Sequence, residues 1–376
     1  MESLERSGRF DYDVISLSTS ASDEASVRIL APRSWLRGVR VIEKEMNGIT
    51  LRHVGAQFTE LEIQRYRPRK TLTNLLNNYA LIQVVSGISP LLLAAADCKK
   101  PKALLVASRT MVERAAFLKQ DKGLPGLLRR SMTHVISRME AKALQEADVV
   151  FVLNQWMKEY VSQEIGLERT IFAPPGIDTE FWHPATYRPD GYILCVGRLA
   201  DPRKNLLLLL SAYRRLLDRN GSTPKLMFAG RTAPTADTKA QIEQLGLRNF
   251  VEIIVNPSPE QLRAIYQNAA LFVLSSDEEG LGLVILEAMA CGIPVISTDS
   301  GGPATLIDEH ATGLMTPVGD ADALADAMQT LLREPVRRRK MGEAGRQRAE
   351  QRFSLDVMGN LYLAKYDELL RGTARW

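Results

Sequence analysis

Two glutamates stand eight residues apart on either side of a glycine-containing turn. Glu279 precedes Gly280-Leu-Gly282, and Glu287 falls about two turns into a helix expected from Leu283. Amides at a helix N-terminus attract anions, and two carboxylates facing one cavity can accept hydrogen bonds from vicinal hydroxyls. The spacing therefore predicts a site for an anionic ligand rich in hydroxyls. The plainer alternative is a capped helix with a solvated acidic loop, because such a spacing often arises by chance.

Basic residues follow another expected strand of the same half of the chain. Tyr192–Val196 runs into Gly197, Arg198 and Lys204. The guanidinium fork can chelate a diphosphate and the lysine can neutralise it as a point charge. A further glycine turn at Gly230 would let a nucleotide ring approach the backbone. The alternative reading makes Arg198 a surface ion pair and Lys204 a solvated residue before a helix.

Short apolar runs alternate with helical patterns along nearly the whole chain, which predicts βαβ units and parallel sheets covered on both faces. The expected strands are 13–17, 39–42, 80–85, 103–106, 149–153, 192–196, 225–229, 251–255, 271–274 and 294–297. The fold class is therefore α/β, with two doubly wound domains facing a cleft. Ligands of such domains bind at the carboxyl ends of the strands.

The alternation restarts after Pro174-Pro175-Gly176, where two prolines and a glycine favour a linker. We expect an N-terminal domain over 1–170, a linker over 171–190 and a nucleotide-binding domain over 191–354. The final helical segment, 355–376, has no strand after it. It is therefore expected to pack back on the N-terminal domain.

Composition limits the class of protein. The 376 residues include 45% hydrophobic and 24% charged side chains, as in soluble globular proteins. Three widely spaced cysteines favour neither a disulfide framework nor a zinc site. The first residues lack the apolar stretch of a secretory signal, so a cytoplasmic location is expected. The uncharged segment 71–96 is too often interrupted by polar residues to span a membrane.

Charge is distributed unevenly. Residues 1–168 hold 24 basic and 19 acidic side chains, whereas the remainder holds 24 and 25. Basic runs lie at 65–70, 99–102 and 129–130. They are either ordinary solvated surface or a cationic face toward anionic lipid or an anionic acceptor. Nucleic acid is not expected as a partner, because no interleaved aromatics or binding motif accompany the charge.

Taken together in order, these motifs resemble a known family. PPGID at 174–178, YILCVGRL at 192–199, FAG at 228–230 and EGLGLVILEAMACGIPVI at 279–296 are similar to retaining glycosyltransferases of family 4, which have the GT-B fold. The similarity extends over the whole C-terminal domain. The resemblance implies a nucleoside-diphosphate sugar donor and transfer without a metal ion or other cofactor.

The resemblance also implies roles for particular residues. Arg198 and Lys204 would bind the diphosphate and stabilise it as it leaves, Glu279 would contact the transferred sugar, and Glu287 would hold the ribose hydroxyls. The expected catalytic residues are thus Glu279, Arg198 and Lys204. The expected donor-binding residues are Gly197, Arg198, Lys204, Gly230, Glu279, Gly280, Leu281, Gly282, Leu283 and Glu287.

The N-terminal half departs from the family pattern at two places. SLSTSASDEAS at 16–26 stands where a Gly-Gly loop is common, and Ser108-Arg109 ends the strand that often ends in an active-site histidine. Ser108 and Arg109 are therefore the expected acceptor-side residues. The one Asp-x-Asp match, Asp320 to Asp322, is interpreted as a helix cap rather than a metal site.

The leading hypothesis is transfer of a sugar to a hydroxyl of a glycan or lipid-linked acceptor, with the anomeric configuration retained. The expected location is cytoplasmic, with or without peripheral contact at the inner face of an anionic membrane. A non-catalytic protein that binds sugar nucleotides or glycans is the alternative from another class. An epimerase of the same fold would need N-terminal acid–base residues that are not evident. A dehydrogenase is disfavoured, because no glycine-rich fingerprint follows the first strand.

Overall fold

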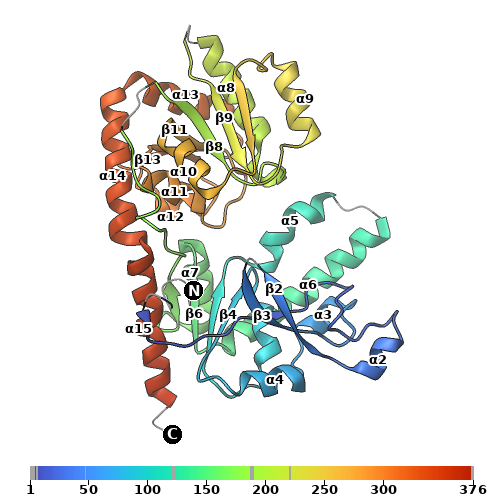
Figure 1. Ribbon diagram of the computed structural model, residues 1–376. Coiled ribbons are helices and arrows are strands. Elements are labelled where there is room, and N and C mark those ends of the chain that lie inside the picture. The colour runs from blue at the N-terminus through green and yellow to red at the C-terminus, as the bar shows by residue number, and fades with distance from the viewer. Residues whose placement is uncertain are drawn as a thin grey trace. The chain divides into compact units, whose positions relative to one another are not determined.

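The chain forms two compact units in the computed structural model (Figure 1). The structure describes residues 5, 7–46, 48–120, 123–186, 190–219 and 222–373. The first unit comprises residues 1–173 and the tail 360–376, and the second comprises residues 174–359. The break after residue 173 adjoins the two successive prolines, within the segment 171–190 that the sequence predicts as a linker.

Six parallel strands form the sheet of the second unit, in the order β10-β9-β8-β11-β12-β13. Every residue of β11 is buried, as expected for a parallel strand covered on both faces. The strand order reverses between β8 and β11, which is where doubly wound sheets open a ligand crevice. The strands are β8 (Tyr192–Val196), β9 (Leu226–Gly230), β10 (Val251–Val255), β11 (Ala269–Leu274), β12 (Val295–Thr298) and β13 (Gly313–Thr316).

Helices cover this sheet and bury its apolar side chains. Four of the five successive leucines that begin α8 are buried in one cluster, whereas Leu207 is 39% exposed, so this run serves the core as its composition indicates. The capping carboxylate of Asp320 accepts from the amides of Asp322 and Ala323, which confirms the cap interpretation. The helices are α8 (Leu206–Arg219), α9 (Ala236–Gln244), α10 (Pro259–Gln267), α11 (Leu283–Ala290), α12 (Pro303–Leu306), α13 (Ala321–Arg333) and α14 (Pro335–Phe353).

The first unit has two sheets rather than one. The order is β4-β5-β6-β7 in the larger and β1-β3-β2 in the smaller. A pocket of about 520 Å³ separates them, lined by apolar side chains of both β1 and β4. The strands are β1 (Ile15–Leu17), β2 (Val41–Met46), β3 (Ile49–Val54), β4 (Ile82–Ser86), β5 (Lys102–Val106), β6 (Val149–Val152) and β7 (Thr170–Phe172).

The expectation of parallel sheets throughout is wrong for one pair. β2 and β3 run antiparallel, with Val41 opposite Val54 and Met46 opposite Ile49. They form a hairpin because the link between them is too short for a parallel crossover. Half-exposed β2 does not carry the continuous apolar run of a doubly covered strand.

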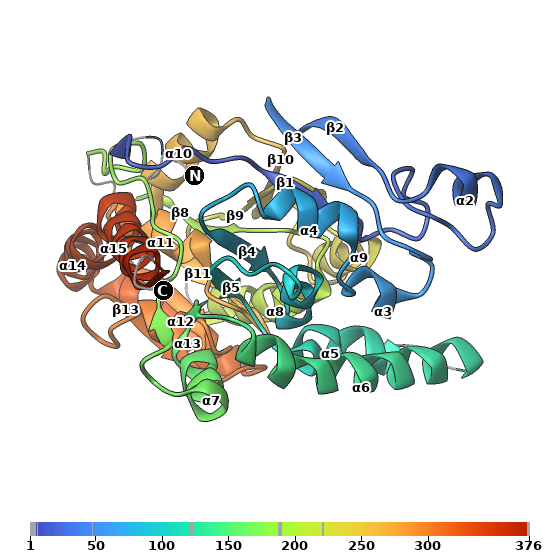
Figure 2. The same ribbon diagram turned by 90° about the horizontal axis from the view of Figure 1, so that it is seen from below.

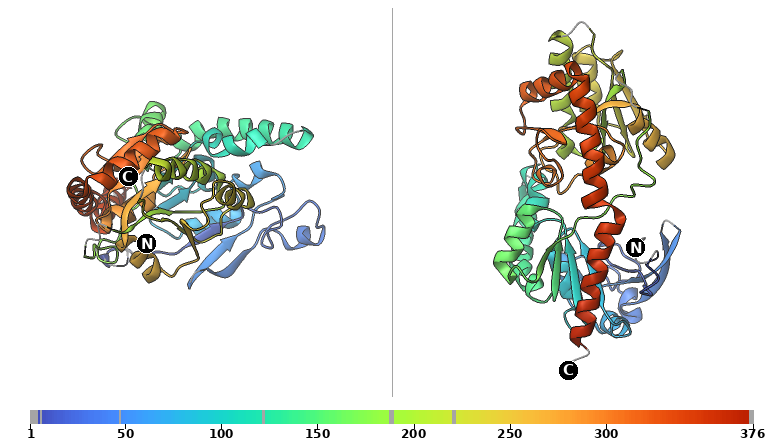
Figure 3. Two further views of the ribbon diagram at one scale, coloured as in Figure 1. Left: turned by 90° about the horizontal axis from the view of Figure 1, so that it is seen from above. Right: turned by 90° about the vertical axis from the view of Figure 1, so that its left-hand side faces the viewer.

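Helices complete the first unit, and the C-terminal tail joins it. Residues 360–373 belong to this unit (Figure 3), where Tyr362 lies against Phe151 at a ring-centroid distance of 4.3 Å and Tyr366 Oη donates to Gln83 Oε1 at 2.9 Å. Within the described residues, no helix is both long and apolar enough to cross a membrane. The helices are α2 (Arg33–Arg37), α3 (Glu62–Arg65), α4 (Lys70–Leu76), α5 (Thr110–Gln120), α6 (Gly123–Gln145), α7 (Gln155–Ile165) and α15 (Leu355–Thr373), with a 3₁₀ helix at Ser89–Ala95.

Candidate functional site

Hydrogen bonds join the loops after β8 and β11 at the reversal of strand order. Ser275 Oγ donates to the Lys204 carbonyl at 2.9 Å, and the Asp277 amide donates to the Arg203 carbonyl at 2.8 Å. Asn205, in the left-handed region at φ 42°, donates from Nδ2 to Asp277 Oδ1 at 2.7 Å. These hydrogen bonds tie together the two loops that carry the predicted chemistry. We refer to residues 197–205 and 275–282 as the platform.

Lys204 and Glu279 form an ion pair on this platform. Their side chains are only 10% and 16% exposed, and Ser276 Oγ lies 3.5 Å from the carboxylate. A short 3₁₀ helix, Pro202–Lys204, directs the lysine across the end of β8 toward the loop after β11. The structure thus brings together two of the three residues predicted to be catalytic.

A third loop, after β12, fixes the backbone of Glu279. The Glu279 amide donates to the Ser300 carbonyl at 3.0 Å, and the Gly302 amide donates to the Glu279 carbonyl at 2.8 Å. A Cβ on Gly302 would lie 2.5 Å from Leu281 Cα, so only glycine permits this approach. The position of the Glu279 carboxylate is therefore set by backbone contacts on both sides.

The glycine turn leads directly into α11. Gly282 occupies the cap position at φ 90°, a conformation that favours glycine, and no side chain caps the helix. A Cβ on Gly280 would meet nothing within 4 Å, and Leu283 is 45% exposed, whereas Leu281 is buried. The turn thus has open space beside its backbone, as the predicted donor contact requires.

The third residue predicted to be catalytic, Arg198, forms an ion pair with Asp201. Its side chain is 68% exposed, and Nη2 lies 2.9 Å from Asp201 Oδ2. Asp201 also receives Arg203 Nε at 3.1 Å and Nη2 at 2.9 Å. Burial alone would raise the pKa of Asp201, but the hydrogen bonds and charge of Arg203, with the charge of Arg198, outweigh it and lower the pKa. Asp201 is therefore an anionic anchor for both arginines.

Glu287 has a different set of partners. Tyr266 Oη, on α10, donates to Glu287 Oε2 at 2.7 Å and lies 3.2 Å from the Val284 carbonyl. Burial raises the pKa of Glu287 to about 7, and the hydrogen bond from Tyr266 offsets only part of that effect. The structure thus places Glu287 on the helix that follows the Glu279 turn, with its carboxylate held by Tyr266.

The two remaining glycines of the predicted donor pocket differ in what surrounds them. A Cβ on Gly197 would meet Lys204 Cε at 3.5 Å, an ordinary contact beside the ion pair. A Cβ on Gly230 would lie 2.0 Å from the Gly197 carbonyl oxygen. A side chain at Gly230, the last residue of β9, would therefore collide with the backbone that follows β8.

The predicted acceptor-side residues lie in the first unit, at the carboxyl end of β5. The Arg109 guanidinium lies over the Tyr160 ring, 4.0 Å from its centroid, and the buried Arg109 Nε has no hydrogen-bond partner among the described residues. The Ser108 amide donates to the Gly87 carbonyl at 2.9 Å. Beside them, the buried carboxylate of Glu140 accepts from Thr110 Oγ1 at 2.7 Å.

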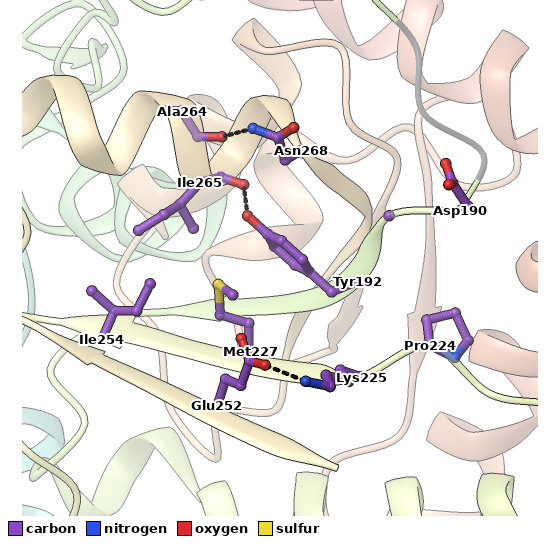
Figure 4. Close-up of a pocket in the computed structure, with 11 residues that line it drawn as sticks. Asp190, Tyr192, Pro224, Lys225, Met227, Glu252, Ile254, Ala264, Ile265 and Asn268 are labelled. Atoms are coloured by element: carbon purple, nitrogen blue, oxygen red, sulfur yellow. Dashed lines mark hydrogen bonds and ion pairs between the residues drawn. The ribbon is translucent and has the colours of Figure 1, made fainter. Parts of the chain in front are cut away.

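A separate pocket of about 550 Å³ lies at the opposite, amino ends of the strands of the second unit (Figure 4). Tyr192 Oη donates there to the Ile265 carbonyl at 2.6 Å, and Lys225 pairs with Glu252. Parallel sheets bind ligands at their carboxyl ends. The exposed ion pair between Lys225 and Glu252 therefore lies outside the candidate site.

Sequence reasoning missed Asp201 and Tyr266. Asp201 carries a recognisable signal, because aspartate before proline often caps a short helix, and the cap is present. Its second function, holding Arg198, depends on side-chain geometry. Tyr266 carries no such signal, because it lies one strand away in sequence and reads as an ordinary core aromatic.

Solved structures of known proteins share this architecture. Sucrose-phosphate synthase from Thermosynechococcus elongatus matches with a TM-score of 0.74, covering 99% of this chain and 92% of that one at 21% identity. Anabaena HepE in complex with UDP and glucose matches with a TM-score of 0.66, covering 95% and 100% at 16% identity. The chain accordingly has the GT-B fold of glycosyltransferases.

The sequence places the chain more narrowly. Residues 177–348 match the family described as Glycosyl transferases group 1. This match contains the platform, the glycine turn and both glutamates. This part of the chain is therefore similar to the glycosyl transferases group 1, in agreement with the resemblance seen in its motifs.

Two curated relatives illustrate the similarity. A GDP-mannose-dependent alpha-(1-6)-phosphatidylinositol monomannoside mannosyltransferase of Mycolicibacterium smegmatis is 30% identical over 250 residues, covering 60% of this chain and 63% of that protein. A D-inositol 3-phosphate glycosyltransferase of Kribbella flavida is 32% identical over 210 residues, covering 51% and 49%. The chain thus matches about half to just under two thirds of the length of these relatives.

Proposed function

We propose that the protein transfers a sugar from a nucleoside-diphosphate sugar to an acceptor hydroxyl, with retention of the anomeric configuration. The observation that carries this proposal is the Lys204–Glu279 pair at the reversal of strand order. A cation for the diphosphate stands there directly beside a carboxylate suited to sugar hydroxyls. The match of residues 177–348 to the glycosyl transferases group 1 and the names of the relatives support it.

Stabilisation of the departing diphosphate is the main catalytic effect in this account. Lys204 faces the phosphates from the end of β8, and Arg198, anchored by Asp201, remains 68% exposed and able to swing onto them. Glu279 holds the sugar by its hydroxyls rather than acting as a nucleophile, because its carboxylate is already engaged by the Lys204 ammonium. We propose departure on the same face, with the leaving phosphate assisting deprotonation of the acceptor, because the resemblance to retaining glycosyltransferases favours this route.

The acceptor is a glycan or a lipid-linked molecule, with Ser108 and Arg109 on the acceptor side. The relative from Mycolicibacterium smegmatis is named for a phosphatidylinositol monomannoside and the one from Kribbella flavida for an inositol phosphate, which supports an acceptor of this kind. We place the enzyme in the cytoplasm, in peripheral contact with the inner face of the membrane. No metal ion or cofactor takes part in the proposed reaction.

Replacing Glu279 by Gln tests the proposal. The amide keeps the shape but loses the charge, so turnover should fall roughly 100-fold or more while nucleotide affinity survives. Transfer is measured with GDP-mannose and UDP-glucose as donors over a panel of glycan and lipid-linked acceptors. Glu252→Gln provides the matched control. Glu252 also pairs with a lysine, but it lies near the amino ends of the strands, away from the candidate site at their carboxyl ends.

Two results would count against the proposal. Unchanged turnover in Glu279→Gln would remove this carboxylate from the mechanism. Nucleotide binding by the wild-type protein without donor hydrolysis or transfer to any acceptor would favour the non-catalytic alternative. Thermal stabilisation by UDP, GDP, ADP and dTDP identifies the base first, since a ligand at a hundred times its dissociation constant adds about 2.7 kcal/mol.

A further inference from the structure

The first unit exposes large apolar side chains in a short segment that contains only positive charge. In residues 28–37, Leu36 is 93% exposed, Leu30 is 83% exposed and Trp35 is 55% exposed. Arg33 and Arg37 lie beside them and are also exposed, and residues 28–40 contain four arginines and no acidic residue. We refer to residues 28–37 as the arginine–leucine tip.

Hydrogen bonds hold this tip in one conformation. Ser34, which is buried, accepts from the Arg28 amide at 2.8 Å and donates to the Ala31 carbonyl at 2.7 Å. The Trp35 indole donates to the Arg28 carbonyl at 2.7 Å. Glu60 accepts from the amide of Leu30 at 3.3 Å. Several backbone groups of the tip are thus hydrogen-bonded while the side chains of Leu30 and Leu36 are exposed.

A second segment of the same kind lies at the beginning of α6. Leu127 and Leu128 are 61% and 63% exposed, and Arg129 and Arg130, which follow them, are exposed as well. Figures 1 and 2 both show α2 and the amino end of α6 projecting on the same side of the first unit. Two apolar and basic segments, distant in sequence, therefore present themselves in one direction.

The other basic runs do not form such a surface. Arg65 donates from Nη1 to the Thr19 carbonyl and from Nε to the Thr59 carbonyl, and the buried Lys102 donates from Nζ to the Cys98 carbonyl at 2.9 Å. Arg65 and Lys102 are thus hydrogen-bonded to the protein's own backbone, whereas Arg67 and Lys99 of the same runs are exposed.

We propose that the arginine–leucine tip, together with the amino end of α6, docks the enzyme on an anionic lipid bilayer. This inference deepens the peripheral location proposed above and rests on it. Leucine and tryptophan side chains enter the boundary between headgroups and acyl chains, and arginines beside them contact lipid phosphates. The charge complementarity favours a bilayer with anionic headgroups, which would bring the enzyme close to a lipid-linked acceptor.

Vesicle binding by the full-length protein tests this inference. Vesicles of phosphatidylcholine with about 30% phosphatidylglycerol are compared with phosphatidylcholine alone, at about 0.1 M and about 1 M salt. The protein should sediment with anionic vesicles at low salt and be released at high salt, because the screening length shortens from roughly 10 Å to roughly 3 Å. Trp35 emission should shift to shorter wavelength on binding, and a Trp35→Phe variant should lose that shift.

Matched variants test whether binding depends on this particular surface or on any exposed leucine or basic residue of the unit. Leu36→Ser should weaken binding to anionic vesicles roughly tenfold, whereas Leu167→Ser, at a side chain that is 69% exposed elsewhere in the same unit, should leave it unchanged. Replacing Arg33 and Arg37 by Gln should weaken binding about twentyfold. Replacing Arg67 and Lys99 by Gln removes the same charge from the other basic runs and should have much less effect.

Two outcomes would overturn the inference. Absence of binding to anionic vesicles at low salt would exclude a bilayer and leave a protein partner as the occupant of this surface. Equal losses in Leu36→Ser and Leu167→Ser would show that the tip has no special part. Nucleoside-diphosphate binding by the same variants should stay at the wild-type level, so failure here would be distinguishable from failure of the proposed sugar transfer.

Discussion

At the scale of single residues, Glu287 links the site to pH. Its pKa is raised from the usual 4.5 to about 7 because the carboxyl group is buried, so the folded protein binds a proton that the unfolded chain releases. This contribution to stability is complete below about pH 4.5 and is lost as the pH rises through about 7. Protonated Glu287 retains the contact with Tyr266 without a buried charge.

Glu287→Gln should therefore flatten the pH dependence of stability. The difference in unfolding free energy between wild type and variant should change by roughly 2–3 kcal/mol between about pH 4.5 and pH 8, to the disadvantage of the wild type at the higher pH. Urea titrations at several pH values measure it. Parallel curves for the two proteins over that range would mean that Glu287 is an ordinary exposed carboxylate.

At the scale of elements, the glycines around the turn before α11 divide into two functions. Gly302 lies against the backbone of Leu281, and a Cβ would approach Leu281 Cα to 2.5 Å, whereas Gly280 has open space beside it. Gly302→Ala should lower the unfolding free energy by roughly 1–3 kcal/mol, because the loop after β12 must move. Gly280→Ala should leave stability within about 0.5 kcal/mol and weaken nucleotide-sugar binding by filling the approach to the turn.

Thermal unfolding and calorimetric titration of the two alanine variants distinguish these effects. A stable Gly302→Ala protein would show that the loops after β11 and β12 are not held as described. A Gly280→Ala protein with unchanged donor affinity would place the ligand elsewhere than beside this turn.

The elements were predictable where burial on both faces left a continuous apolar run. β6 and β11 are of this kind, and the sequence identified them. The alternating residues of β3 and the three residues of β7 were missed, since a half-exposed or very short strand lacks that signal. The division of the first unit into two sheets depends on strand pairing between distant segments, which local patterns do not encode.

Part of the candidate site could also be predicted from the sequence. Lys204 and Glu279 each follow a buried strand, so the topology alone places both at the reversal of strand order. The hydrogen bond between Glu287 and Tyr266 was not predictable, because it depends on how α10 packs beside α11. The sequence likewise revealed which residues are basic, but not that Arg65 and Lys102 are used internally while Arg33 and Arg37 are exposed.

At the scale of the whole molecule, we assign donor binding to the second unit and acceptor binding and membrane contact to the first. The second unit carries the proposed donor platform, with Lys204, Glu279 and Arg198 on the loops after β8 and β11. The first unit carries Ser108 and Arg109, which we propose face the acceptor, and the arginine–leucine tip, which we propose contacts the membrane. The tail from residue 360 belongs to the first unit, so the chain ends in the unit in which it begins.

The central claim is that one ammonium and one carboxylate at the ends of β8 and β11 hold the two halves of a single pyrophosphate-linked sugar. Calorimetric titration of nucleoside diphosphate and monophosphate tests it in Glu279→Gln and in the double variant Lys204→Met with Glu279→Gln. The two proteins differ only at Lys204, and neither keeps a Glu279 carboxylate without its ammonium partner. The account predicts that the single variant binds the diphosphate at least about tenfold more tightly than the monophosphate, and that this preference is smaller in the double variant, which keeps only Arg198 for the diphosphate. An undiminished preference in the double variant would contradict it.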